Sequence, residues 1–173
     1  RQTPMHSIDL MEKACRAFVV WFTERFDNQY KTGIVCGTGN NGGDGLGITR
    51  MLKESVYDVT VWVIRGSVAE SEDFRINLDR LKGNVQVHDI ASRPDDGSFQ
   101  QQDILIDAIF GSGLSRPVEG IYEEVITLMN RTKATRIAVD IPSGLMADTH
   151  SSGTIVQAHY TVSFQLPRLA FLM

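Results

Sequence analysis

Apolar residues in this chain follow two spacings that alternate along the sequence. Between residues 9 and 26 they recur every four residues, at Leu10, Ala14, Phe18 and Phe22, which predicts a helix with one apolar face. Short apolar runs rich in β-branched residues separate the helical segments and predict strands. Helices are expected at residues 9–26, from the glycine-rich stretch to about 53, at 70–81 and at 118–130, and strands at 33–36, 59–64, 85–87, 103–110, 136–140 and 160–164.

Strands that alternate with helices indicate a parallel sheet covered on both faces. Because such crossovers are right-handed, we predict an α/β fold with a doubly wound, mostly parallel sheet, which is a Rossmann-like three-layer sandwich. Ligands of these folds bind beyond the carboxyl ends of the strands. The chain shows no repeat or linker, so we expect residues 1–173 to form a single domain. The sequence begins at Arg1, and we expect this domain to lack both native termini.

Composition and charge narrow the class of protein. Hydrophobic residues make up 42% of the chain and charged residues 22%, which is typical of a globular domain. The net charge of −4 argues against binding to nucleic acids or to an anionic membrane. Cys15 and Cys36 are interpreted as buried free thiols of a cytoplasmic protein.

Three polar loops follow predicted strands. Asn40–Asp44 follows the first strand, Gly111–Pro117 the fourth and Pro142–Gly144 the fifth. Because the carboxyl ends of parallel strands share one edge of the sheet, these loops are expected to meet. Their common position, predicted from three separate segments, favours a functional site more strongly than any one motif does.

The first of these loops is rich in glycine. Gly37-x-Gly39-x-x-Gly42 matches the dinucleotide-binding fingerprint, in which glycine permits a positive φ and lets backbone N–H groups approach a phosphate. That fingerprint requires an acidic residue at the end of the second strand, where this chain has Arg65. Arg65 would suit a 2′-phosphate or lie on the surface, so an NAD(P)-dependent oxidoreductase is a minor alternative.

Polar residues in the same loop point to chemistry. Asn40, Asn41 and Asp44 add two amides and a carboxylate to the glycines. A carboxylate in an anion-binding turn repels phosphate unless it faces a hydroxyl, an amide or a cation. Residues of these types also build purely structural turns, which is the alternative interpretation.

Asp107 lies inside the apolar fourth strand, where a carboxylate must be paired, bind a cation or be protonated. Alternatively, backbone N–H groups of the neighbouring glycine loop satisfy it. Asp140 ends the fifth strand and Ser143 follows three residues later, where a helix cap or an Asx turn is the alternative. Asn41, Asp107 and Ser143 together offer hard oxygen ligands, which fit an alkali or alkaline-earth cation.

Three stretches of the sequence carry a resemblance to a known family. They are GTGNNGGDG at Gly37–Gly45, DAIFGSGLSRPVEG at Asp107–Gly120 and VDIPSGLMAD at Val139–Asp148, with weaker matches at Ile8–Ala14 and Tyr160–Leu169. Together they resemble the NAD(P)H-hydrate epimerase family, also known as the YjeF N-terminal domain. The resemblance implies an isomerase of metabolite repair. It would interconvert the R and S epimers of hydrated NADH and NADPH (NAD(P)HX) at nicotinamide C6. The resemblance implies both NADHX and NADPHX as substrates.

The resemblance also implies partners. An S-specific NAD(P)HX dehydratase, either separate or fused downstream, would restore the cofactor after epimerisation. Members of the family form homodimers. The main alternative function is a non-catalytic scaffold of the same fold that binds a ligand or a protein.

The resemblance further implies a set of site residues. Asn41, Asp107 and Ser143 match the ligands of one K⁺ ion per subunit. Asp140 is the expected catalytic residue and Asp44 its helper: loss of the C6 hydroxyl would leave an iminium, and water would add to the opposite face. Ring opening and reclosure is the alternative route. Substrate contacts are expected at Asn40, Asn41, Gly42, Gly43, Asp44, Gly111, Ser112, Gly113, Leu114, Ser115, Arg116, Pro117, Tyr122 and Asp140.

The chain departs from the family pattern at three positions. Thr38 replaces a proline of the first loop, a change that we expect to alter rigidity more than chemistry. Met146 stands where an aspartate is usual, beside the expected cation site. Arg168 replaces a lysine, which keeps the charge but changes the donor geometry.

Overall fold

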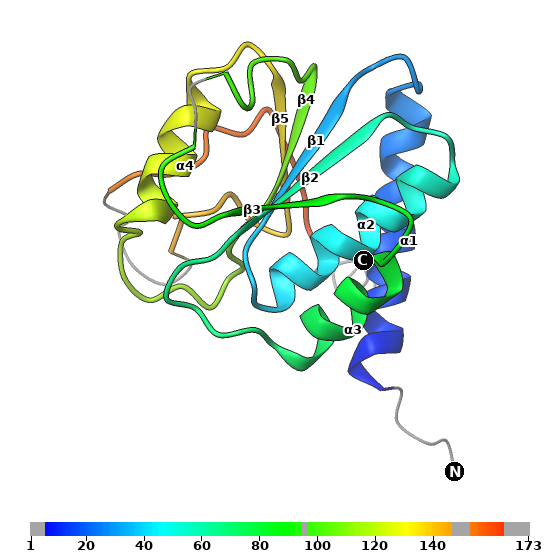
Figure 1. Ribbon diagram of the computed structural model, residues 1–173, viewed down its shortest axis with the longest axis horizontal. Coiled ribbons are helices and arrows are strands. Elements are labelled where there is room, and N and C mark those ends of the chain that lie inside the picture. Colours follow the sequence, from blue (N-terminus) through cyan, green and yellow to red (C-terminus); the bar gives the residue numbers. More distant parts are fainter. Residues whose placement is uncertain (1–5, 95–96, 147–152, 165–173) are drawn as a thin grey trace, which may run out of the picture.

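The computed structural model describes residues 6–94, 97–146 and 153–164 (Figure 1). None of the helices in this part of the chain combines the length and the apolarity needed to cross a membrane. The elements, in chain order, are α1 (Ser7–Arg25), β1 (Thr32–Cys36), α2 (Asn40–Glu54), β2 (Val59–Ile64), α3 (Glu72–Leu81), β3 (Val87–Ile90), β4 (Ile104–Ala108), α4 (Ile121–Asn130), β5 (Thr135–Val139) and β6 (Tyr160–Val162).

The strands form one parallel sheet. Within the described residues it has six strands in the order β3-β2-β1-β4-β5-β6, and every pair is parallel. Val35, in β1, pairs with Trp62 of β2 on one side and with Asp107 of β4 on the other. The chain order reverses between β1 and β4, which is where doubly wound folds open a ligand-binding crevice. The predicted doubly wound α/β fold is confirmed.

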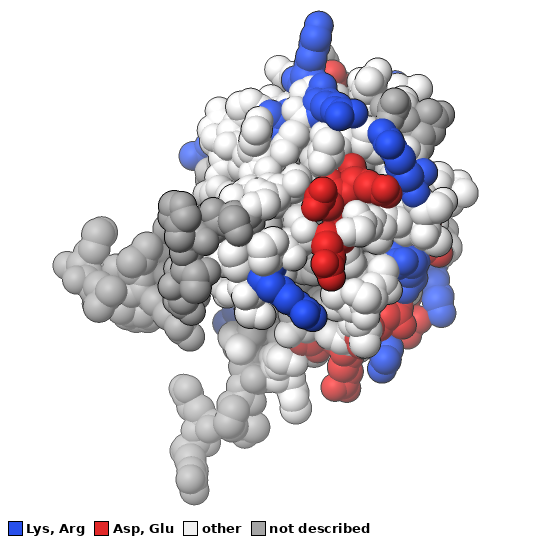
Figure 2. Space-filling model, turned by 90° about the vertical axis from the view of Figure 1, so that its left-hand side faces the viewer, with Lys and Arg blue, Asp and Glu red and all other residues white. Residues whose placement is uncertain are grey.

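Helices cover both faces of the sheet. Successive side chains of a strand point to opposite faces, so Ile34 and Cys36 pack with α1, α2 and α3, whereas Val35 packs with α4. Figure 1 shows α1, α2 and α3 on one side of the sheet and α4 on the other. The face on the side of α4 carries a group of acidic side chains with basic ones around it (Figure 2). These three layers leave the carboxyl edge of the sheet to the connecting loops.

Most predicted elements agree with the structure to within three residues at each end. The third strand is displaced from residues 85–87 to Val87–Ile90, because His88 and Asp89 are exposed and give this edge strand no apolar pattern. Cys15 and Cys36 are buried free thiols, as expected.

The glycine-rich stretch is mostly helix, which corrects the expectation of a long loop. Helix α2 begins at Asn40, so only Gly37–Gly39 separates it from β1. No glycine between 37 and 47 has a positive φ, so the role expected for them in a left-handed backbone is wrong. They permit close packing instead. A methyl group on Gly42 would lie 1.8 Å from the carbonyl oxygen of Gly37, and one on Gly45 would lie 2.6 Å from Cys36 Sγ.

Candidate active site

The first turn of α2 brings amide and acidic side chains to the carboxyl end of β1. Asn40 is exposed, whereas Asn41 and Asp44 are buried. From α3, the buried Asn77 donates from Nδ2 to the carbonyl oxygen of Gly43 at 2.9 Å. A helix that is remote in sequence therefore fixes this turn. The first N–H groups of a helix lack helical acceptors, so the turn also suits a phosphate.

Asp107 and Ser143 form a buried hydrogen-bonded pair. Asp107 is fully buried in β4 and accepts from the Ser143 N–H at 2.7 Å, from Ser143 Oγ at 2.5 Å and from the Ile109 N–H at 3.2 Å. Burial raises the pKa of Asp107 to about 6, and these hydrogen bonds act in the opposite direction. Two of the three donors are backbone N–H groups, but they belong to Ile109 and Ser143 and not to the glycine loop that the alternative interpretation named; the third donor is the hydroxyl of Ser143.

Asn41 and Asp140 flank Gly111, which starts the loop after β4. A methyl group on Gly111 would lie 3.5 Å from Asn41 Nδ2 and 3.8 Å from Asp140 Oδ2. Asn41 Nδ2 donates to the carbonyl oxygen of Val139 at 3.1 Å. Asn41 Oδ1 is buried and has no hydrogen-bond donor among the described residues. Residues that follow β1, β4 and β5 are thus brought together at one edge of the sheet.

Asp44 and Asp140 are electrostatically coupled. Asp44 is 9% exposed, and burial is the largest cause that raises its pKa to about 8, followed by the negative charges of Asp140 and Asp73. A carboxyl group with this pKa holds its proton at neutral pH. A carboxylic acid beside a second carboxylate is the arrangement from which acid and base roles arise in enzymes.

Asp140 has an unusual backbone conformation. Its φ is 73°, in the left-handed region that residues other than glycine rarely adopt. The Asp140 N–H donates to the carbonyl oxygen of Val162 at 2.8 Å, and its carboxylate accepts from the Phe164 N–H at 3.4 Å. Hydrogen bonds to β6 and to the residues after it therefore accompany a strained backbone, which is a feature that clusters at functional sites.

The loop after β4 lies largely in solvent. Its first residue follows Phe110, whose N–H donates to Ser143 Oγ at 2.9 Å, so the loop is tied to the segment after β5. Arg116 is exposed, and no ion pair is found for it within the described residues. Within the loop, Gly111 and Leu114 are half-buried, and Ser112, Gly113, Ser115, Arg116 and Pro117 are exposed.

Tyr122 has a packing role in this structure. Its side chain, on α4, is 6% exposed, and its ring centroid lies 4.8 Å from that of Phe110. The Tyr122 hydroxyl accepts from the Val68 N–H at 3.2 Å. Tyr122 thus contacts the segment after β2 and the segment after β4.

Two buried polar residues of α3 were not expected from the sequence. Asp73 is 8% exposed, accepts from Ser7 Oγ at 3.2 Å and raises the pKa of Asp44. Asn77 holds Gly43, as described above. Both are ordinary polar positions of an amphipathic helix, and their burial depends on contact between α3 and the first turn of α2.

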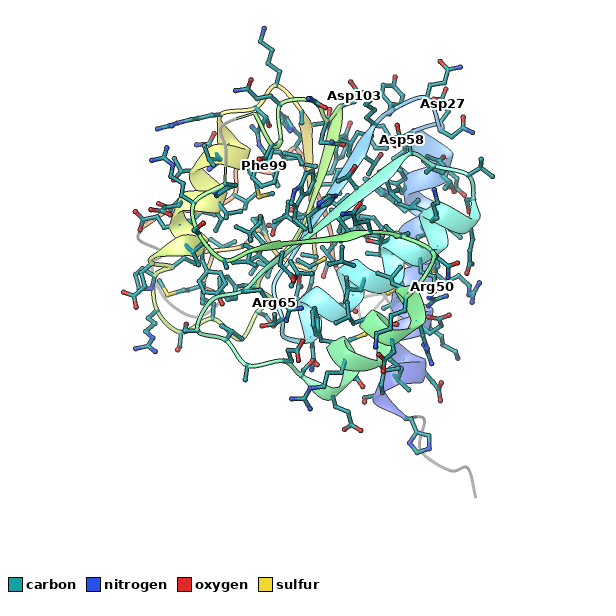
Figure 3. All side chains as sticks on the ribbon, viewed as in Figure 1. Asp27, Arg50, Asp58, Arg65, Phe99 and Asp103 are labelled. Atoms are coloured by element: carbon teal, nitrogen blue, oxygen red, sulfur yellow. The ribbon has the colours of Figure 1, made fainter. Side chains whose placement is uncertain are left out.

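Arg65 lies at the carboxyl end of β2 (Figure 3). It is engaged in ion pairs with Glu70 at 2.8 Å and with Asp89 at 3.1 Å, so its charge is compensated within the chain. Met146 is buried, and Arg168 lies outside the described residues.

Comparisons with known proteins identify the family of this chain. Residues 7–170 match the family model described as YjeF-related protein N-terminus. A bifunctional NAD(P)H-hydrate repair enzyme of Thermofilum pendens is 39% identical over 145 residues, which are 81% of this chain and 28% of that protein. An NAD(P)H-hydrate epimerase of Limosilactobacillus fermentum is 36% identical over 164 residues, which are 94% of this chain and 77% of that protein.

A solved structure agrees with the fold. The crystal structure of the yeast protein ynu0 superposes with a TM-score of 0.77 at 22% sequence identity, and covers 91% of this chain and 71% of that one. The family model spans nearly all of the described residues, from α1 to β6. The chain therefore belongs to the YjeF-related protein N-terminus family.

Proposed function

We propose that this chain is an isomerase that interconverts the R and S forms of hydrated NADH and NADPH at nicotinamide C6. Relatives named NAD(P)H-hydrate epimerase support the proposal, because two of them are 36% and 35% identical over 94% and 92% of this chain. In the structure, the coupling of Asp44 to Asp140 carries it. Epimerisation through loss and return of a hydroxyl needs both an acid and a base.

The proposed reaction begins when the lone pair of the ring nitrogen expels the C6 hydroxyl and leaves a planar iminium. Asp44, with its pKa raised to about 8, donates its proton to the departing oxygen, which leaves as water. Water then adds to the opposite face of C6, and Asp140 takes its proton. Transfer of this proton from Asp140 to Asp44 restores the starting state, so that one turnover neither releases nor consumes a proton.

Two segments are proposed to bind the dinucleotide. Asn40–Asp44 supplies the first turn of α2, and Gly111–Pro117, with Arg116, supplies the opposite wall toward the diphosphate. Anion binding by free N–H groups and a guanidinium is consistent with both. Tyr122 is proposed to support the substrate site through its contacts with Val68 and Phe110.

Asn41, Asp107 and Ser143 are proposed to hold one K⁺ ion. The buried Asn41 Oδ1 has no donor among the described residues, and the hydrogen bonds of Asp107 within this part of the chain come from neutral groups. Oxygen ligands with a single carboxylate fit a monovalent cation better than zinc. No cluster of three His, Cys, Asp or Glu suited to a metal occurs among the described residues. When bound, the ion supplies positive charge beside Asp107.

The proposal is tested by supplying a mixture of R and S epimers to an S-specific dehydratase with ATP. The chain should accelerate consumption of the R epimer. Asp140→Ala should abolish this acceleration, whereas Asp58→Ala should retain it, because Asp58 is exposed at the opposite edge of the sheet (Figure 3). Circular dichroism of both variants controls for folding.

Three results would contradict the proposal. Unchanged consumption of the R epimer in the presence of the wild-type chain would exclude the activity. Stable binding of the substrate without turnover would favour a scaffold. A wild-type rate for Asp140→Ala would remove Asp140 from catalysis.

We further propose that the chain acts as a cytoplasmic homodimer that works with an S-specific dehydratase. Bifunctional relatives such as that of Thermofilum pendens are consistent with this coupling. Leu10 and Val20 of α1 are large apolar side chains with 56% and 52% of their surface exposed, and are candidates for a subunit contact. Light scattering of the purified chain measures its mass: a monomer at all concentrations would exclude the dimer.

A further inference from the structure

The segment after β2 runs beside the first turn of α2 at the carboxyl edge. Strand β2 pairs with β1, with Val63 next to Cys36, so the residues that follow the two strands lie close together. Val68, in this segment, is apolar, yet 39% of its surface is exposed. No sequence motif draws attention to it.

Buried side chains hold the backbone of Val68 on both sides. The hydroxyl of Thr38 donates to the carbonyl oxygen of Val68 at 2.7 Å, and the Val68 N–H donates to the hydroxyl of Tyr122 at 3.2 Å. Thr38 is 2% exposed and Tyr122 is 6% exposed. A methyl group on Gly66 would lie 2.6 Å from the Tyr122 ring, so the segment also packs directly on that ring. Two buried side chains thus fix the backbone of a loop residue, although loops generally run over the surface and are more mobile than the elements they connect.

Thr38 and Tyr122, which bond to Val68, contact opposite sides of the candidate site. Thr38 lies in the short loop that leads into Asn40, and its carbonyl oxygen accepts from the Ser71 N–H at 2.9 Å. Tyr122 packs on Phe110, whose N–H donates to Ser143. The position of Val68 is therefore fixed relative to the first turn of α2 and to the segments after β4 and β5.

We propose that Val68 forms a third wall of the substrate site, against which a flat base of the dinucleotide packs, and that Thr38 is the positioning residue that holds this wall. This inference rests on the proposed function. An exposed apolar side chain on a backbone that is already held in place can bury one face of a ring without loss of loop entropy on binding. The function of the Thr38 hydroxyl is then to preorganise Val68 and not to touch the substrate.

The test compares four single variants in the coupled epimerisation assay. Val68→Ala removes the wall, and Thr38→Val removes the hydroxyl at nearly constant volume. Both should raise KM about three- to tenfold and leave kcat within about twofold, as expected for lost ground-state and transition-state contact alike. Thr38→Ser keeps the hydroxyl and should restore the wild-type KM.

Thr132→Val is the matched control. Thr132 is also buried, at 9% exposure, and its hydroxyl donates to the carbonyl oxygen of Met129 at 2.7 Å, at the end of α4 remote from the carboxyl edge. Thr132→Val should lower the melting temperature as much as Thr38→Val does and leave KM unchanged. A purely structural role of Thr38 would make the two variants alike in KM, which overturns the proposal.

A double-mutant cycle separates coupled from independent effects. If Thr38 acts through Val68, the double variant should have the KM of Val68→Ala alone. Additive increases in KM, or an unchanged KM for Val68→Ala, would overturn the inference.

NADPH binding, monitored by the quenching of tryptophan fluorescence, tests the inference without requiring turnover. If the wild-type chain binds NADPH without epimerising its hydrate, the proposed function fails, and the same variants are then compared by Kd. A three- to tenfold weaker Kd for Val68→Ala and Thr38→Val would support the wall. A wild-type chain that neither epimerises the hydrate nor binds NADPH would overturn both proposals.

Discussion

Replacement of Asp44 by asparagine should stabilise the protein at neutral pH while it removes the proposed activity. Asp44 is buried in the first turn of α2 with Asp140 and Asp73 near it, so its charged form is disfavoured in the folded state. Asparagine has nearly the same shape and cannot ionise. The change therefore removes a buried ionisable group without opening a cavity.

The magnitude follows from the difference between the pKa of Asp44 in the folded protein and its ordinary value. Burial raises this pKa from 3.8 to about 8. Below the lower value both states hold the proton. Between the two values the unfolded chain ionises first, so the free energy of unfolding falls by about 1.36 kcal/mol per pH unit as pH rises. At pH 7 the loss is roughly 4 kcal/mol, and the asparagine variant avoids it.

Urea unfolding measured by tryptophan fluorescence between pH 4 and pH 8 tests this expectation. The difference in unfolding free energy between Asp44→Asn and wild type should be near zero at pH 4 and should grow with pH. This difference is the informative quantity, because Asp107, with a pKa of about 6, titrates in both proteins. Asp58→Asn, an exposed site, controls for the chemical change. A difference that is equal at pH 4 and pH 7 would refute the reasoning.

Three further predictions concern the cation, the glycines and the buried serine. Replacing K⁺ by a bulky organic cation at constant ionic strength should lower the melting temperature of the wild type but not of Asn41→Ala; equal melting curves for the wild type would contradict the K⁺ site. Gly42→Ala should cost about 3 kcal/mol or more in chemical unfolding, because its methyl group would lie 1.8 Å from a carbonyl oxygen, whereas at Gly39 a methyl group meets nothing within 4 Å and should cost about 1 kcal/mol or less. Ser143→Ala should cost about 1–3 kcal/mol, and more above pH 6 than below it, because the hydroxyl stabilises the ionised form of Asp107; a loss that does not vary with pH would contradict this assignment.

The sheet was predictable because local pattern and tertiary environment agree there. Val59–Ile64 is a β-branched apolar run, and it forms a strand with the predicted bounds. The meeting of Asn41, Gly111 and Asp140 was predictable for a topological reason, since the carboxyl ends of parallel strands share an edge. No knowledge of side-chain contacts was needed for either inference.

Where long-range packing decides, the sequence was insufficient. Asn40–Asp44 consists of residues with low helix propensity, yet it starts α2, because the glycines let the helix approach β1 closely and the packing gained outweighs propensity. Likewise, Asp73 and Asn77 look like solvent-facing positions of α3. Their roles toward Asp44 and Gly43 exist only once α3 lies against α2.

Three carboxylates, Asp44, Asp107 and Asp140, gather at one edge of the sheet, and none of the ion pairs found among the described residues involves them. Two of them have a raised pKa, so the fold is less stable at neutral pH than it would be with neutral residues at these sites. A scaffold has no need for an ionisable group at Asp44 or Asp140, whereas the proposed acid–base reaction requires both. If Asp44→Asn is both more stable at pH 7 and inactive, the instability is a consequence of chemistry; if it is more stable and fully active, Asp44 has no catalytic role.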